Sequence, residues 1–263
     1  MKVKYINPGV EQMIDSIIGF QSEGESEFWS GALYHFYPQI DRDYAQSLPF
    51  PERKRYIESA IRAIYAEAEP EINRKAAMYN RYWAECEAQI AGALSDAFGV
   101  DCTSRYNGIT ARVGLNPVSP RYLREQAFDI FYLNSEKGAI GLSIHEIIHF
   151  VWFDVWHKLF GDGFEEYERP SLKWILSEMV VESIMRDPRL SSINPYFPRE
   201  NGGGCIYPYF FDMRAGDGLI LETLDRIYRS EDIQDFMRDS YAYCLEHERE
   251  IRSHIEAAES GGV

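Results

Sequence analysis

The segment Ser143–Trp156 reads SIHEIIHFVWFDVW and contains the pentapeptide HEIIH. On a helix, side chains four positions apart lie on one face, one turn from each other. His145 and His149 could therefore hold one metal ion together and leave other coordination positions open. Glu146 lies about 100° round the helix from His145, so it would miss the ion but could reach a water molecule beside it. Two ligands and a carboxylate base are what a zinc hydrolase needs.

The surroundings of this motif favour a metal site over a structural role. H-E-x-x-H is a zinc metalloprotease signature, although a buried helix with hydrogen-bonded histidines is the alternative. From Ile140 to Trp156 the only formal charges are Glu146 and Asp154, and a helix that is apolar on all sides is buried. Two histidines and a glutamate in such a helix each need a buried partner. One metal ion with a water molecule would satisfy all three.

Length and composition indicate a globular protein that does not bind polyanions. The chain has 263 residues, 45% of them hydrophobic, enough for one large domain or two lobes. Its formal net charge of −15 argues against nucleic acid or an anionic membrane as partner. The N-terminus has no signal-peptide pattern, and no run of about 18 apolar residues would span a membrane. Scattered cysteines without C-x-x-C spacing indicate reduced thiols, so we expect a cytoplasmic protein. The sequence does not determine its oligomeric state.

Residues 1–99 are expected to form a helical N-terminal lobe. Val10–Phe20 is amphipathic, and a helical run is expected from about Glu52 to Ala68. Pro70 would restart the pattern, because proline is tolerated in the first turn of a helix, and this second run stops near Gly99. The lobe could cover one side of a cleft.

Beyond this lobe the sequence changes to strands and turns. Gly108–Leu115 and Phe128–Leu133 have strand character. The polar turn Asn134–Gly138 then leads into the motif helix from about Ala139. The order predicts a domain at 100–263 and, for the whole chain, an α+β fold that is predominantly helical with a small mixed sheet.

A catalytic zinc site needs a third protein ligand. His157 lies about 80° from the face of His149, so it fits only if the helix breaks first. Better candidates are Glu178 and Glu182, the only charged residues between Trp174 and Met185. Two carboxylates four residues apart in an apolar helix repel each other unless a cation lies between them. A metal ion explains them better than a solvated acidic face or a structural ion pair.

The two helices together resemble the zincin metallopeptidases, specifically the thermolysin-like gluzincins. His145, Glu146 and His149 match the first helix of the family pattern. Its second helix carries a glutamate ligand and, four residues later, an acid that supports a zinc-bound histidine. Glu178 matches the ligand and Glu182 the supporting acid, where the thermolysin group would have aspartate. The resemblance implies zinc as cofactor, a zincin-like catalytic core, and hydrolysis of a peptide or small-molecule amide.

The resemblance covers about residues 104–186, including the strand before the motif helix. Phe128–Leu133 resembles the edge strand that pairs with extended substrate in zincins. If this strand were paired on both sides, a small molecule entering end-on would be favoured instead. The 28 residues between His149 and Glu178 exceed the compact thermolysin-like spacing, so Glu182 stays open as the alternative ligand.

The expected function is a zinc-dependent hydrolase, with a metallopeptidase as the first choice. Tyr207 and Tyr209 are candidate donors to an oxyanion, a role that tyrosine or histidine plays in gluzincins; aromatic packing around Pro208 is the alternative. Another class of function is a zincin-like protein without turnover, a metal-stabilised binding or interaction protein. Glu146 favours the enzyme, because a structural metal site has no use for a base beside an open position.

Overall fold

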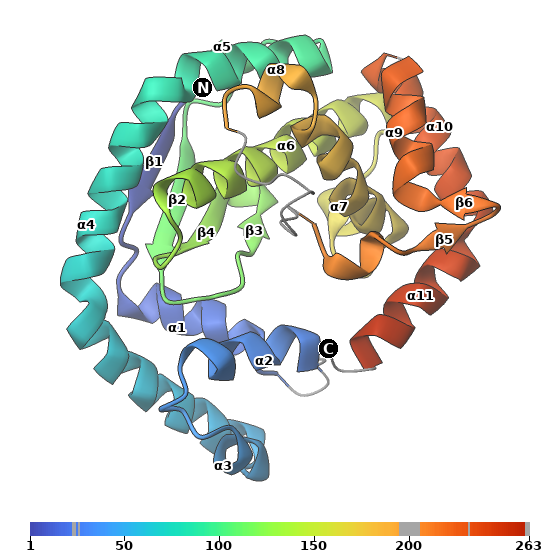
Figure 1. Cartoon of the computed structure of the whole chain (residues 1–263). Coiled ribbons are helices and arrows are strands. Elements are labelled where there is room, and N and C mark those ends of the chain that lie inside the picture. The colour runs from blue at the N-terminus through green and yellow to red at the C-terminus, as the bar shows by residue number, and fades with distance from the viewer. Residues whose placement is uncertain (23–24, 26, 195–205, 231, 261–263) are drawn as a thin grey trace.

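The described part of the chain is mostly helical with a small mixed sheet (Figure 1), which confirms the predicted α+β class. The computed structural model describes all residues except 23–24, 26, 195–205, 231 and 261–263. In chain order the elements are β1 (Val3–Ile6), α1 (Val10–Gly19), α2 (Glu27–Phe36), α3 (Arg42–Ser47), α4 (Phe50–Phe98), α5 (Cys102–Arg105), β2 (Ile109–Gly114), β3 (Arg121–Tyr122), η1 (Leu123–Glu125), β4 (Ala127–Phe131), α6 (Glu136–Phe160), η2 (Phe164–Tyr167), α7 (Leu172–Met185), α8 (Pro188–Ser191), η4 (Pro208–Phe210), β5 (Arg214–Ala215), β6 (Gly218–Leu219), α9 (Ile220–Ser230), α10 (Ile233–Glu246) and α11 (Glu248–Ser260).

The larger sheet has the strand order β1-β2-β4-β3. Strands β1, β2 and β4 are parallel, and β3 runs antiparallel to β4. The outer edge of β1 is covered by α4, because the Asn80 amide accepts from Tyr5 N at 3.1 Å and donates to Tyr5 O at 2.7 Å. This side chain therefore replaces a neighbouring strand and blocks that edge.

Strand β4 is internal, so the prediction that Phe128–Leu133 is an edge strand is wrong. It pairs with β2 on one side and with β3 on the other, and Asp129 N donates to Pro120 O at 3.0 Å. The chain reverses direction after Asn116, and residues 120–122 pair with β4. This segment is too short to be recognised as a strand from the sequence. The edge nearest the motif helix is β3.

The two faces of the sheet pack against different helices. Side chains alternate along a strand, so Phe128 faces α6, where its ring lies 6.3 Å from that of Phe150. Asp129 faces the other way and accepts a hydrogen bond from Ser16 of α1. The two faces of β4 thus meet different helices, and Arg121, opposite Phe128 in the register, shares the α6 face.

Helix α4 is continuous, whereas two helical runs separated at Pro70 were expected. With 49 residues it is about 74 Å long, and it curves along one side of the molecule (Figure 1). Ile61 and Ile72 are both fully buried. Their separation of eleven residues is close to three helical turns, so the buried face continues past the exposed proline. Packing on both sides holds the helix together where propensity alone predicts a break.

Helix α6 is the central helix of the fold. By length and composition it could cross a membrane, but 89% of its apolar window is buried inside the protein. It lies against β4, α4, α7 and α10. The predicted domain boundary at residue 99 stays a prediction; strand β1 from the first part and β2 from the second belong to one sheet.

Candidate metal centre

The motif residues lie in the middle of α6, which begins three residues before the expected Ala139. Ser135 caps the helix by accepting from Gly138 N, and Gly161 ends it in the left-handed conformation with φ 78°. His145, Glu146 and His149 are all buried. The three side chains offer ligand atoms within 4.8 Å of one another. A buried group of residues that could hold a metal ion is therefore present where the sequence predicts it.

Helix α7 brings Glu178 to the same place. Ser171 is its N-cap and accepts from Trp174 N. Packing of α7 on α6 buries the Glu178 carboxylate against both histidines. Its Oε2 lies 3.6 Å from His145 Nε2, and its Oε1 lies 3.6 Å from His149 Nε2.

These atoms fit a metal ion. The two Nε2 atoms face each other at 3.0 Å, so they share either a proton or an ion. A tetrahedral zinc with bonds of about 2.0–2.1 Å has its ligand atoms about 3.3 Å apart. The observed separations of 3.0–3.6 Å bracket that value. Burial, with Arg121 nearby, lowers the pKa of His149 to about 3, which leaves it in the neutral form that binds metals.

Glu146 lies beside the contact between Glu178 and the two histidines. Its Oε1 is 3.8 Å from His145 Nε2, and its Oε2 is buried without a hydrogen-bond partner among the described residues. Burial raises the pKa of Glu146 to about 7. A carboxylate that accepts protons near neutral pH and has an unpartnered oxygen can serve as a general base.

Arg121 is a member of the site that we did not predict from the sequence. Its Nη1 donates to Glu178 Oε1 at 2.5 Å, and its guanidinium lies 5.8 Å from the ring centre of Phe153. Burial opposes ionisation of Glu178, but the positive charge of Arg121 outweighs it and holds the pKa of Glu178 well below its usual range. Arg121 and Glu178 are 57 positions apart and meet only through the pairing of β3 with β4, so no local motif could reveal the contact.

Glu182 is buried one turn after Glu178, and its expected support of a zinc-bound histidine stays a prediction. The Nδ1 atoms of His145 and His149 are both buried and without a partner among the described residues. The two nitrogens of an imidazole point to different sides of the ring. Helix α7 can therefore place Glu178 against both Nε2 atoms without placing Glu182, one turn later, against an Nδ1 atom.

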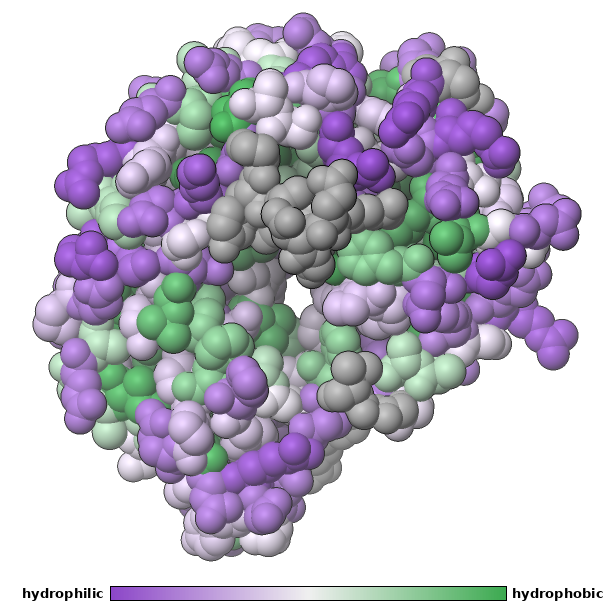
Figure 2. Space-filling model, viewed as in Figure 1, coloured by the Kyte–Doolittle hydropathy of each residue, from purple (hydrophilic) through white to green (hydrophobic). Residues whose placement is uncertain are grey.

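A cleft of about 330 Å³ leads to this centre and is lined by His145, Glu146, Glu178 and Tyr207. Figure 2 shows a hollow near the middle of this face, between the sheet and α7 as placed in Figure 1. Tyr207 is half-buried, and its ring packs 5.2 Å from Trp29 and 5.5 Å from Tyr209. Tyr207 thus borders the predicted site and also packs among aromatic rings.

Trp29 brings α2 to the mouth of the cleft. Its Nε1 donates to Glu259 of α11 at 3.3 Å. Beside it, Arg169 pairs with Glu25 at 3.0 Å and lies over the Trp29 ring at 4.7 Å. Segments from both ends of the chain therefore border the entrance to the centre.

Other candidate residues lie elsewhere. His157 is exposed, with Nδ1 2.5 Å from Asp162 O, and His254 Nε2 lies 2.8 Å from Tyr209 O. Cys205, whose thiol is also a possible metal ligand, lies outside the described residues. Neither histidine belongs to the group around Glu178.

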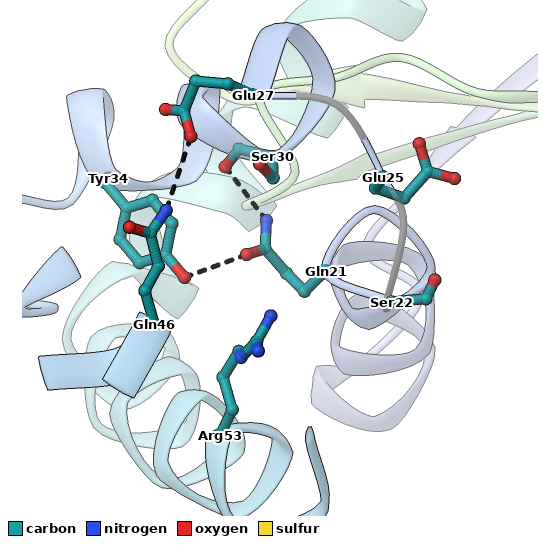
Figure 3. Close-up of a pocket in the computed structure, with 8 residues that line it drawn as sticks. All are labelled: Gln21, Ser22, Glu25, Glu27, Ser30, Tyr34, Gln46 and Arg53. Atoms are coloured by element: carbon teal, nitrogen blue, oxygen red, sulfur yellow. Dashed lines mark hydrogen bonds between the residues drawn. The ribbon is translucent and has the colours of Figure 1, made fainter. Parts of the chain in front are cut away.

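A second cavity, of about 260 Å³, lies between α1, α2, α3 and α4 (Figure 3). Tyr34 donates to Gln21 Oε1, and Gln21 Nε2 donates to Ser30 O, both at 3.0 Å. Arg53 points into the same space. This polar cavity holds no histidine, and among the described residues the group of possible metal ligands is the one formed by His145, Glu146 and His149.

Comparison of the chain with protein-family models, with curated proteins and with solved structures finds no match.

Proposed function

We propose that this protein is a zinc-dependent hydrolase of amide bonds, with His145, His149 and Glu178 as ligands and Glu146 as base. The observation that carries the proposal is the convergence of two Nε2 atoms and a carboxylate at 3.0–3.6 Å, with an unpartnered carboxylate oxygen beside them. The resemblance to gluzincins supports zinc over other divalent ions. Histidine and carboxylate ligands are also what zinc takes in hydrolases.

The chain's own residues divide the chemical work. When bound, the metal ion would polarise a carbonyl and lower the pKa of water. Glu146 would accept the proton of the attacking water at its free Oε2 and pass it to the leaving amine. Tyr207 and Arg121 are positioned to donate to negative charge that develops on the substrate, since both line the same cleft.

Because β4 is internal, the sheet edge that could bind a peptide is β3, which is shorter than β4. Pro120 is hydrogen-bonded to β4, so in an antiparallel pair the N–H and C=O of its neighbours Ser119 and Arg121 point away from the sheet. Both residues line the cleft. We propose a short peptide, or a small amide, as substrate, because this edge can align few residues. The free thiols of Cys86, Cys102 and Cys244 suit the cytoplasmic location that we propose.

One observation favours a protein without turnover. The ion pair between Arg121 and Glu178 already gives the buried carboxylate a cation. A site held together in this way could serve a binding or interaction protein. The unpartnered Oε2 of Glu146 favours the enzyme, because a buried carboxylate oxygen without a partner is costly and needs a reason.

Metal analysis of four proteins, the parent and three variants, tests the proposal. We expect the purified protein to hold about one zinc per chain. Glu146→Gln should keep the zinc and lose hydrolysis, because an amide cannot accept the proton. Glu178→Gln should lose most of the zinc, as should His145→Ala. Lack of any transition metal, with no rise in melting temperature on adding zinc, would show that the central idea is wrong. Equal metal loss in both glutamine variants would show that the roles of ligand and base are misassigned.

A further inference from the structure

Arg121 has hydrogen-bonding capacity that the described protein does not use. A guanidinium carries five N–H donors, and the one hydrogen bond that Arg121 makes within the described residues is from Nη1 to Glu178. None of its nitrogens is among the buried polar atoms that lack a partner. The remaining donors are therefore open to the cleft, although the side chain as a whole is only 11% exposed.

The shape of the sheet directs these donors at the metal centre. Arg121 lies on the free edge of β3, and its side chain points towards α6 and α7. The ring of Phe153 supports the guanidinium from α6, which limits its rotation. A planar fork that is fixed against a ring is suited to bind a carboxylate through two parallel hydrogen bonds.

The charge balance of the centre favours an anion at this place. Arg121 pairs with Glu178, and Glu146 is the other carboxylate that contacts a histidine of the group. With a divalent ion added and the histidines neutral as its ligands, these groups together carry one excess positive charge, which is costly in a medium of low dielectric constant. A singly charged carboxylate beside Arg121 would remove that excess. The second arginine of the cleft, Arg169, is already paired with Glu25.

We propose that Arg121 recognises a substrate carboxylate beside the metal centre, so that the substrates of this site carry a carboxylate next to the amide bond that is cleaved. The inference rests on the proposed function, since it places the scissile bond at the metal. Two sources share this chemistry: the free C-terminus of a peptide and the side chain of an acidic residue.

Three small probes distinguish these sources. N-benzoyl-asparagine carries only the terminal carboxylate, its isomer N-benzoyl-aspartic acid α-amide carries only the side-chain carboxylate, and N-benzoyl-asparagine amide carries neither. Each is titrated by calorimetry into zinc-loaded Glu146→Gln protein, in which hydrolysis is blocked. We expect one of the two acids to bind at least tenfold more tightly than the neutral amide, and the stronger acid identifies the source. Equal affinity for all three probes would overturn the proposal.

Substitution of Arg121 in the same background locates the carboxylate. Arg121→Gln should weaken binding of the preferred acid by about 10- to 100-fold, the effect of losing hydrogen bonds to a charged group. Arg121→Lys keeps a positive charge beside Glu178 and therefore the folded site, but it lacks the fork, so we expect a loss of about fivefold or more. Arg169→Gln is the matched control, because it removes the same charge from the same cleft, and it should change the affinity by less than about threefold.

Zinc uptake, measured by competition with a chelator, separates the two ways of failing. Arg121→Gln should bind zinc at least as tightly as its background, because a buried positive charge and a competitor for Glu178 are both removed. Zinc uptake together with unchanged acid binding in both Arg121 variants would place the carboxylate on the metal and overturn this inference alone. Absence of zinc from the background protein would overturn the proposed function and this inference together.

Discussion

Asp129, on the α1 face of the sheet, is a buried carboxyl outside the metal centre. Its Oδ2 accepts hydrogen bonds from Ser16 and Tyr122, and its Oδ1 is buried without a partner among the described residues. Burial raises the pKa of Asp129 to about 6. Because the folded state binds this proton more tightly than the unfolded state does, the associated stability is present below about pH 4 and is lost as pH rises through about 6.

The stability of Asp129→Asn relative to the parent should therefore rise with pH. The shift of about two pKa units corresponds to about 3 kcal/mol, so the free energy of unfolding of the variant relative to the parent should increase by about that amount between about pH 4 and about pH 7. Urea unfolding at both pH values measures it, with the same change at the exposed Asp15 as control for the loss of a negative charge. A difference that does not vary with pH would contradict the prediction.

Residues of the centre differ in how far the sequence reveals them. His145, Glu146 and His149 follow from one local spacing, because a helix fixes the positions of residues four apart. Glu178 could be proposed, with Glu182 as the alternative, because two carboxylates four residues apart in an apolar helix need a cation between them. Arg121 could not be proposed from the sequence. Nothing near it indicates that it lies on the short strand β3 with its side chain directed towards α7. Long-range register, rather than local propensity, decides that contact.

At the scale of elements, long and strongly patterned helices were predicted better than short strands. The amphipathic α1 and the apolar helices α6 and α7 were expected near their observed positions. Strands β1 and β3 were not expected, because four and two residues are too few to show a period. The error at β4 has the same origin: without β3, its partner, an internal strand looks like an edge.

Helix α4 offers a test of how packing overrides propensity. Pro70 lacks the N–H that would bond to the preceding turn, and it is exposed, so its ring contributes little packing. Pro70→Ala should raise the free energy of unfolding by about 1–2 kcal/mol. A proline inside a helix costs about 3 kcal/mol relative to alanine, but it also restricts the unfolded chain, and the loss of that restriction offsets part of the gain. Urea unfolding at fixed zinc measures the change. Glu67→Ala, on the exposed side nearby, is the control, and a lower stability of Pro70→Ala than of the parent would contradict the prediction.

At the scale of the whole molecule, the net charge of −15 acts on stability. Most described ion pairs lie at the surface, where each contributes little. Repulsion among the excess carboxylates should dominate and should be screened by salt. We expect the free energy of unfolding to rise between about 0.01 M and about 0.3 M potassium chloride. Urea unfolding at both concentrations measures it, and a fall would show that attractive pairs outweigh the repulsion.

The pairing of β1 with β2 has a consequence for the order in which the chain assembles. Val3 lies beside Ile109, so during synthesis the first strand waits for about a hundred further residues, or about 5–20 seconds at usual rates of translation. Helix α4 needs only local hydrogen bonds, and Asn80 can hold Tyr5 before β2 emerges from the ribosome. The histidines and Glu178 leave the ribosome later still. Zinc would then be acquired by a nascent protein whose N-terminal framework already exists, and would complete folding rather than initiate it.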